Sequence, residues 1–455
     1  MNKTLRIALA VAIALSAPFS YGAATADEAK QLGDTLTPVG ATKAGNKEGT
    51  IPAWTGGLTS PPAGYTPKKE PGAYIDPFKD EKPLLRITGA NASQYADKLS
   101  AGQMELLKRN SDYYLDIYPT HRTAAFPESV YEATKRNATA CHTVKDGLAV
   151  ETACRGGLPF PIPKTGNEVM WNLLLAYQPP QWVYNYGSYV VDTSGHPFVA
   201  SRQNAYSEKG YYLGKERSDP QQYGFIYSTT LYPPRSKGEI TGYADYLDPA
   251  AYPRKAFEFD PGQRRVKLAP SFAYDTPVAQ VGGVLLFDEI SLFSGEMDRF
   301  DFKLVGKKEM YIPYDSYKLN FQCTGEGQVT KAHTVNPGCE RWELHRVWVV
   351  EATLKPNMRH TYSKRTYYID EDTYSSGMSD AYDHSGQLYR SEFLYQVQIY
   401  DAAFPWEGAF SVYDFIKRNY TVQSMLSPTG YLDFKSKAPN ERDLTPDALA
   451  GSGND

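Results

Sequence analysis

The sequence contains little that points to catalysis. Only 7 of its 455 residues are histidine, and no two of them stand at the spacing of a metal site. It has no G-x-S-x-G nucleophile elbow, no H-E-x-x-H helix and no phosphate-binding glycine loop. We therefore predict neither a catalytic centre nor a bound cofactor or metal.

A basic excess and a long hydrophobic segment are also lacking. The chain has 48 Lys and Arg against 52 Asp and Glu, so binding to nucleic acid is not expected. The apolar run at residues 7–17 is too short to span a bilayer, and it follows Lys3 and Arg6 as in a secretory signal peptide. We predict a cleavable signal peptide at residues 1–26, ending at Ala24-Thr25-Ala26, and a periplasmic location. No cysteine follows the cleavage site, so a lipid anchor there is not expected.

Cysteine is scarce, with four residues in the chain. Cys141 and Cys154 are 13 positions apart, and Cys323 and Cys339 are 16 apart. Four cysteines allow three connectivities, and the one that joins these two local pairs closes the shortest loops at the lowest entropic cost. We predict two structural disulfides, each stabilising by roughly 3 kcal/mol, and hence an oxidising compartment.

Tyrosine, in contrast, is abundant, with 36 residues. Aromatic residues favour β-strands. After Pro180, apolar residues alternate with a period of two in nine or ten segments, joined by turns such as 192–195 and 260–263. We expect a mainly β fold with some helices (α+β), in which a large antiparallel sheet curls to bury its apolar face.

Composition also predicts how the chain is organised. Residues 27–90 are rich in glycine and proline and are expected to form an extended strap. Residues 91–429 are expected to form the sheet domain, with helical segments as lids. Residues 430–455 have few apolar side chains, which predicts a flexible tail.

Alternation assigns side chains of two strands to opposite faces. In the strand after the 260–263 turn, Arg265 and Lys267 are expected in solvent, in preference to a lipid headgroup, and Val266 and Leu268 inside. In the strand 387–401 one face is expected to be apolar and the other solvated. The apolar face holds Phe393, Tyr395, Val397 and Ile399, and the solvated face holds Glu392, Gln396 and Gln398.

Two acidic groups are expected in turns rather than in active sites. Asp370-Glu371-Asp372 ends a strand and lacks the glycine and distal glutamate of a calcium loop. A solvated turn is therefore favoured over a cation site or a pair of catalytic carboxylates. Asp383, in the segment YDHSGQ, is expected in a hairpin turn.

Residues 156–180 combine a proline-rich approach with one short helix. Thr165 and Glu168 have the spacing of a capping box, and Pro179-Pro180 ends the segment. Apolar residues within 166–177 share one helical face, so this helix is expected to cover or fill an apolar hollow. The alternative, which the sequence leaves open, is that the helix packs permanently as part of the core. The residues predicted to line the hollow are Phe160, Met170, Trp171, Leu174, Tyr177 and Trp348.

Five segments resemble one known family: residues 44–57, 156–172, 259–275, 292–314 and 365–390. The chain is similar to Gram-negative exported proteins of unassigned function labelled outer membrane lipoprotein-sorting protein-like. It is more distantly similar to the lipoprotein carriers LolA and LolB. The resemblance implies a curved antiparallel half-barrel, closed by helices, with a hydrophobic cavity for acyl chains.

Together these features predict a periplasmic carrier or chaperone for a lipid or another hydrophobic or amphiphilic small molecule. An inner-membrane exporter or an outer-membrane protein would be its partner. One alternative is an envelope enzyme that uses carboxylates such as Asp370 and Asp383 on a glycan or lipid. A second alternative is a scaffold that docks envelope proteins and holds no small ligand.

Overall fold

The computed structural model describes residues 23–66, 74–213, 219–323, 325–426, 431–437 and 439–452. The predicted signal peptide therefore lies almost wholly outside the described residues. The α-helices are α1 (Ala26–Ala29), α2 (Ala101–Arg109), α3 (Glu128–Ala140), α4 (Gly166–Leu174), α5 (Gly210–Leu213), α6 (Tyr317–Phe321), α7 (Glu326–Val329) and α8 (Pro446–Ser452). The 3-10 helices are η1 (Ala92–Lys98), η3 (Pro234–Ser236), η4 (Pro270–Ala273), η5 (Ala279–Val281), η6 (Phe287–Glu289) and η7 (Glu441–Leu444).

The strands are β1 (Leu85–Thr88), β2 (Tyr114–Ile117), β3 (Thr143–Val144), β4 (Ala149–Val150), β5 (Gln181–Val191), β6 (Pro197–Glu208), β7 (Gln222–Tyr232), β8 (Ile240–Tyr246), β9 (Lys255–Asp260), β10 (Arg265–Leu268), β11 (Phe300–Pro313), β12 (Trp342–Leu354), β13 (Lys364–Asp370), β14 (Gly377–Tyr382), β15 (Leu388–Ile399), β16 (Phe404–Asp414), β17 (Asn419–Leu426) and β18 (Leu432–Asp433).

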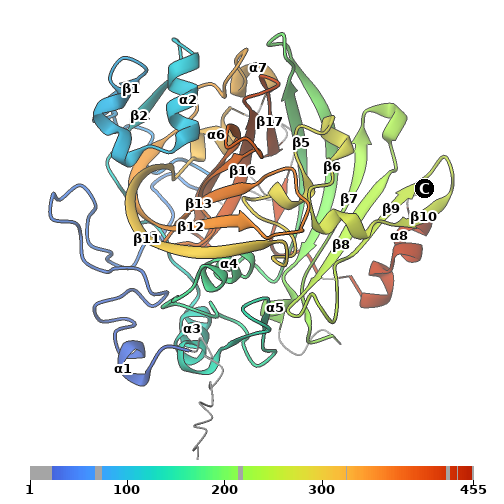
Figure 1. Ribbon diagram of the computed structural model, residues 1–455, viewed down its shortest axis with the longest axis horizontal. Helices are drawn as coiled ribbons and strands as arrows, with labels where there is room; N and C mark the ends of the chain where they lie inside the picture. The colour runs from blue at the N-terminus through green and yellow to red at the C-terminus, as the bar shows by residue number, and fades with distance from the viewer. Residues whose placement is uncertain are drawn as a thin grey trace, which may run out of the picture.

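Within the described residues, sixteen strands form one strongly curved sheet (Figure 1). Its order is β1-β2-β12-β13-β14-β15-β16-β17-β5-β6-β7-β8-β9-β10, with β11 beside β12 and β18 beside β5. The pairings are antiparallel except for one parallel bridge from Ile117 to Trp342. The sheet stays open between β1 and β10, which confirms the predicted mainly β fold with a half-barrel.

The prediction of nine or ten strands missed several strands of this sheet. In β16, Pro405 and Gly408 interrupt the alternation, and Gly408 has a left-handed φ of 67°. β14 is only six residues long, and β1 and β2 have four residues each. Such short segments carry too few apolar side chains for a period of two to stand out.

Both faces of the sheet are covered, so its central strands are buried on two sides. On β15, Phe393 packs in a cluster with Leu106 of α2, whereas Leu394 packs in another cluster with residues of α4. The predicted solvated face of β15 is therefore wrong. Its polar residues Glu392, Gln396 and Gln398 are at most 2% exposed. Alternation separates the two faces of a strand, but it does not show what covers each face.

The N-terminal residues run along the sheet mainly as irregular chain, blue in Figure 1. Ile51 is buried, and Trp54 Nε1 donates to the Ala124 carbonyl at 2.9 Å. The hydroxyls of Tyr65 and Tyr74 donate to Asp401 at 3.0 and 3.1 Å. Aromatic and polar anchors thus hold a segment that has almost no helix or strand.

The C-terminal residues, which we predicted to form a flexible tail, include two elements that contact the sheet. In the described part, β18 pairs with β5, and α8 lies against β8–β10 at the right of Figure 1. Leu449 and Ala450 pack on Phe257 and Phe259 of β9. Two small apolar residues are enough to seat this helix because the outer face of β9 offers two phenylalanines.

Local signals in the sequence are mostly confirmed. Both predicted disulfides are present, Cys141–Cys154 and Cys323–Cys339. The capping box of α4 is formed, with the Glu168 amide donating to Thr165 Oγ1 at 3.2 Å. Helix α4 ends at Leu174, three residues earlier than predicted, which leaves Tyr177 outside it.

Candidate functional site

The concave face of the half-barrel is largely filled by residues 270–299, which connect β10 to β11. Leu285, Leu292 and Phe293 of this segment pack with Leu174 of α4 in one core cluster. Two adjoining cavities of about 140 and 100 Å³ remain, and both are bordered by Tyr184, Ile226, Tyr243, Ile290 and Ser424. Pockets for drug-sized ligands measure about 300–1,000 Å³, so neither of these two cavities encloses a long acyl chain.

Buried ion pairs fix this segment to the sheet. Asp288 Oδ2 accepts from Arg365 Nη1 at 2.9 Å and lies 2.8 Å from His360 Nε2. Glu289 Oε2 accepts from Arg390 Nη1 at 2.8 Å. Burial opposes the ionisation of Asp288, but the charge of Arg365 and the bond to His360 hold its pKa below the ordinary value. Without this segment Arg365 and Arg390 would lose their buried carboxylate partners, so the segment is an integral part of the core.

The residues predicted to line a hydrophobic cavity lie on and around α4. Four are buried (Phe160, Met170, Trp171 and Leu174) and two are half-buried (Tyr177 and Trp348). Leu174 borders the 140 Å³ cavity. Trp171 packs in the core, and its Nε1 donates to the Gly147 carbonyl at 2.9 Å. Gly166 begins α4 against β11, where a Cβ would lie 2.5 Å from the Phe302 carbonyl oxygen. In this arrangement α4 is packed as core.

A larger apolar cleft, of about 630 Å³, lies on the outer face of the sheet beneath residues 441–446. Its walls include Phe225 of β7, Ala244 of β8 and Phe257 of β9. On β9, Phe257 packs towards α8, whereas the adjacent Ala256 packs towards Phe272 and Phe287 of the segment that fills the concave face. The cleft therefore lies mainly on the face of β9 that is opposite the concave face, although Ala256 also borders it.

Leu268 stands at this cleft and is 80% exposed, so its predicted inward position is wrong. Arg265 and Lys267 are exposed, as predicted. Val266, on the same face as Leu268, packs against the cluster that contains α8. Strand β10 lies at the end of the sheet, and α8 covers Val266 but leaves Leu268 open to solvent.

The acidic group after β13 is buried, so the predicted solvated turn is wrong. Asp370, Glu371 and Asp372 are at most 3% exposed. Both carboxylate oxygens of Asp372 accept from Arg122, at 2.6 and 2.8 Å, and Lys307 Nζ lies 2.5 Å from Glu371 Oε2. The turn is internal because Arg122 and the N-terminal segment pack over it, which alternation within β13 cannot show.

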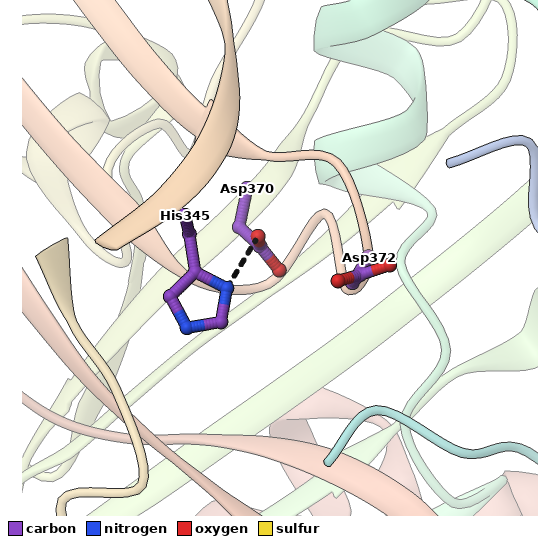
Figure 2. Close-up of side chains that lie close together, drawn as sticks. All are labelled: His345, Asp370 and Asp372. Carbon is purple, nitrogen blue, oxygen red and sulfur yellow. Dashed lines mark ion pairs between the residues drawn. The ribbon is translucent and has the colours of Figure 1, made fainter. Parts of the chain in front are cut away.

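His345 of β12 joins this group, and its ring nitrogen Nδ1 faces Asp370 Oδ1 at 3.7 Å (Figure 2). Ligand atoms of His345, Asp370 and Asp372 all lie within 4.8 Å of one another. Burial and the charge of Asp372 raise the pKa of Asp370 to about 7. These three residues could supply metal ligands, but the Arg122 guanidinium already neutralises Asp372. The arrangement fits an ion-pair network that holds the Arg122 segment to the sheet.

The two carboxylates considered for an enzyme lie at opposite ends of the β13–β14 hairpin. Asp383 is in the predicted turn, where its Oδ1 accepts from the Ser385 amide at 2.8 Å. A hairpin of six paired residues separates Asp370 from Asp383 by about 20 Å. Glycosidase carboxylates stand about 5–10 Å apart, so these two cannot act on one bond.

Two half-buried charged residues that we did not single out border the 140 Å³ cavity: Lys209, directly after β6, and Glu407 in β16. Glu407 lies in the apolar run FPWEGAF, and a charge inside such a strand was the available signal. Lys209 gave no comparable signal, because a lysine after a strand is most often solvated.

Among the described residues, no helix has both the length and the apolar character needed to cross a membrane. The fold and these cavities define a half-barrel protein with apolar spaces, in which Asp370 and Asp383 lie too far apart to act on one bond.

The chain belongs to the family described as "Protein of unknown function (DUF1329)", whose model matches residues 86–450. It is 38% identical over 457 residues to uncharacterized protein PA3922 of Pseudomonas aeruginosa, covering 99% of each chain. A DUF1329 family protein from Desulfovibrio piger has 13% identity and a TM-score of 0.43, covering 62% of this chain and 97% of that one. The LolA superfamily protein NE2245 from Nitrosomonas europaea has 10% identity and a TM-score of 0.38, covering 63% and 99%. The family model and the match to PA3922 confirm the resemblance to a family of unassigned function that was seen in the sequence.

Proposed function

We propose that this protein is a periplasmic carrier or chaperone that shields a lipid or another hydrophobic or amphiphilic ligand, and that the ligand occupies the outer cleft. The observation that supports this is an apolar space of about 630 Å³, within the range of ligand pockets, walled by Phe225, Ala244 and Phe257. Leu268 at its mouth exposes apolar surface that a ligand would cover.

The cleft suits an extended chain better than the other spaces do. The concave cavities are several times smaller. A hollow of about 870 Å³ between η1 and α2 is bordered largely by small residues such as Ala90, Ala92 and Ser93, which offer little contact surface. Ten methylenes buried at about 0.8 kcal/mol each would contribute about 8 kcal/mol. That is similar to the estimated cost of association, so useful affinity requires most of the chain to be enclosed.

Two further features support a periplasmic site of action. The N-terminal sequence has the layout of a signal peptide, and both cysteine pairs are disulfide-bonded. A carrier must receive and release its ligand at membranes. An inner-membrane exporter or an outer-membrane protein would therefore be its partner.

The test compares two leucines of similar exposure. Leu268→Glu places a charge at the cleft, whereas Leu84→Glu places one at an exposed site, 68% accessible, that does not border it. Neither change should alter stability by more than about 0.5 kcal/mol, because both side chains are largely in solvent. We expect palmitate binding, measured by titration calorimetry, to weaken at least tenfold in the first variant only.

Native mass spectrometry of protein purified gently from its own periplasm would complement this titration. Lipid retained in stoichiometric amounts by the wild type, and lost from Leu268→Glu, supports the proposal. Equal palmitate binding by both variants would place the ligand elsewhere, and protein that never retains or binds lipid would exclude the carrier function.

A further inference from the structure

The cavity of about 140 Å³ inside the half-barrel carries two opposite charges that do not neutralise each other directly. It is bordered by Glu208, Lys209, Asp245 and Glu407. Asp245 is engaged by the Arg254 guanidinium at 2.6 and 2.9 Å. Glu208 accepts from the Tyr206 hydroxyl at 2.8 Å. Lys209 and Glu407 therefore have the most bonding capacity left for a guest molecule.

The geometry of these two residues supports that conclusion. Lys209 Nζ has three N–H donors, and it donates one hydrogen bond to the Leu174 carbonyl at 3.2 Å. In the described part of the chain, no ion pair within 4 Å joins Lys209 to Glu407. Burial lowers the pKa of Lys209 and raises that of Glu407, while their mutual attraction opposes both shifts. Asp245 also attracts Lys209, and Glu407 accepts a hydrogen bond from the Ser291 side chain, which leaves its remaining carboxylate capacity for a guest. A guest between them would stabilise both residues if it placed an anionic group near Lys209 and a cationic group near Glu407.

Hydroxyl groups add hydrogen-bonding capacity to the same space. Ser375 borders the cavity, is 3% exposed, and its Oγ has no partner among the described residues. In the adjoining cavity of about 100 Å³ the buried Ser201 Oγ is likewise unpartnered in the described structure. Buried polar groups are usually satisfied, so unpartnered hydroxyls beside a polar cavity point to a polar guest.

We infer that this inner cavity binds a small zwitterion, whose acid group meets Lys209 and whose ammonium group meets Glu407. At about 30 Å³ for each water, 140 Å³ corresponds to four or five waters, which is the size of glycine or alanine. The phosphoethanolamine headgroup of a lipid has the same pair of charges. Tyr184 and Tyr243 would flank the guest where the two cavities adjoin. Glu208 and Phe225 border both this cavity and the outer cleft, but Lys209 and Glu407 border this cavity and not the cleft, so the inference does not depend on the carrier proposal.

The experiment titrates the whole mature chain with glycine, L-alanine, L-serine and phosphoethanolamine, using calorimetry and thermal unfolding. Acetate and ethylammonium, each with only one of the two charges, are the matched ligand controls. We expect a zwitterion to bind and raise Tm, and neither half-ligand to do so. Tighter binding of phosphoethanolamine would assign a headgroup, and tighter binding of an amino acid would assign a free solute.

Lys209→Met and Glu407→Gln should each weaken zwitterion binding at least tenfold, because each removes one charge. Lys308→Met, at an exposed lysine on β11, should leave it unchanged. If either single variant fails to fold, the double variant Lys209→Met, Glu407→Met removes both charges without leaving one unpaired. Palmitate binding in the same variants should stay unchanged, which separates this site from the outer cleft. The inference is overturned if no zwitterion binds the wild type at millimolar concentration, or if binding survives loss of both charges.

Discussion

Glu340 provides a quantitative test of how the core handles buried carboxyl groups. Its side chain is buried, with Oε2 accepting from the Tyr113 hydroxyl at 3.0 Å and Oε1 from the Tyr395 hydroxyl at 2.8 Å. Burial raises its pKa to about 8, although both hydroxyls act in the opposite direction. The folded protein therefore keeps a proton on Glu340 at neutral pH, whereas the unfolded chain releases it above about pH 4.5.

The sign of the effect follows from this difference in proton binding. Glu340 contributes its full stability below about pH 4.5 and loses it as pH rises towards about 8. Between those values the free energy of unfolding should fall by about 1.4 kcal/mol per pH unit on account of this group. From pH 5 to pH 7 that amounts to about 2–3 kcal/mol. Glu340→Gln, which cannot ionise, should be free of this loss.

The assay is urea unfolding of the wild type and Glu340→Gln at pH 5, 6 and 7. Other buried groups, Asp370 among them, titrate in both proteins, so their effects cancel in the difference. We expect the free energy of unfolding of the variant, relative to the wild type, to increase by about 2–3 kcal/mol from pH 5 to pH 7. Glu132→Gln, at an exposed position on α3, should give a constant difference. A pH-independent difference for Glu340→Gln would refute the reasoning, because it would mean that Glu340 ionises alike in both states.

Three further changes can be measured by urea unfolding at pH 7. Met170→Ala should cost about 2–5 kcal/mol because the side chain is fully buried, and a loss below about 1 kcal/mol would instead favour a loosely held lid. Arg122→Met should cost about 3–5 kcal/mol because it leaves Asp372 buried and unpaired. The double variant Arg122→Met, Asp372→Leu should recover part of that loss. If the double variant is as unstable as Arg122→Met alone, the result would argue against the ion pair. Replacing Cys323 and Cys339 by serine should cost about 3 kcal/mol, and an unchanged midpoint would show that this disulfide does not constrain the unfolded chain.

Much of the architecture could be predicted from short stretches of sequence. The capping box of α4 depends on residues three positions apart, and the turn at 260–263 on four consecutive residues. Each disulfide joins cysteines within 16 positions. In these cases the partners are close along the chain, so their types and spacing define the structure. The curved sheet could be predicted because many segments alternate apolar and polar residues, and such strands must bury their apolar faces on a common side.

The candidate sites depended on contacts between distant parts of the chain. Asp372 is buried because Arg122, 250 positions away, pairs with it. Among the described residues, segment 270–299 packs against the concave face and leaves two small cavities there. The outer cleft exists because the C-terminal segment lies over β8–β10.

The sequence by itself therefore determined the secondary structure signals, the disulfides and the class of fold, since these follow from local spacing and from the need to bury apolar surface. Only the tertiary structure decided which faces are covered, which charges are buried and where space remains. Burial is a property of two surfaces that meet, and a single strand or helix specifies only one of them.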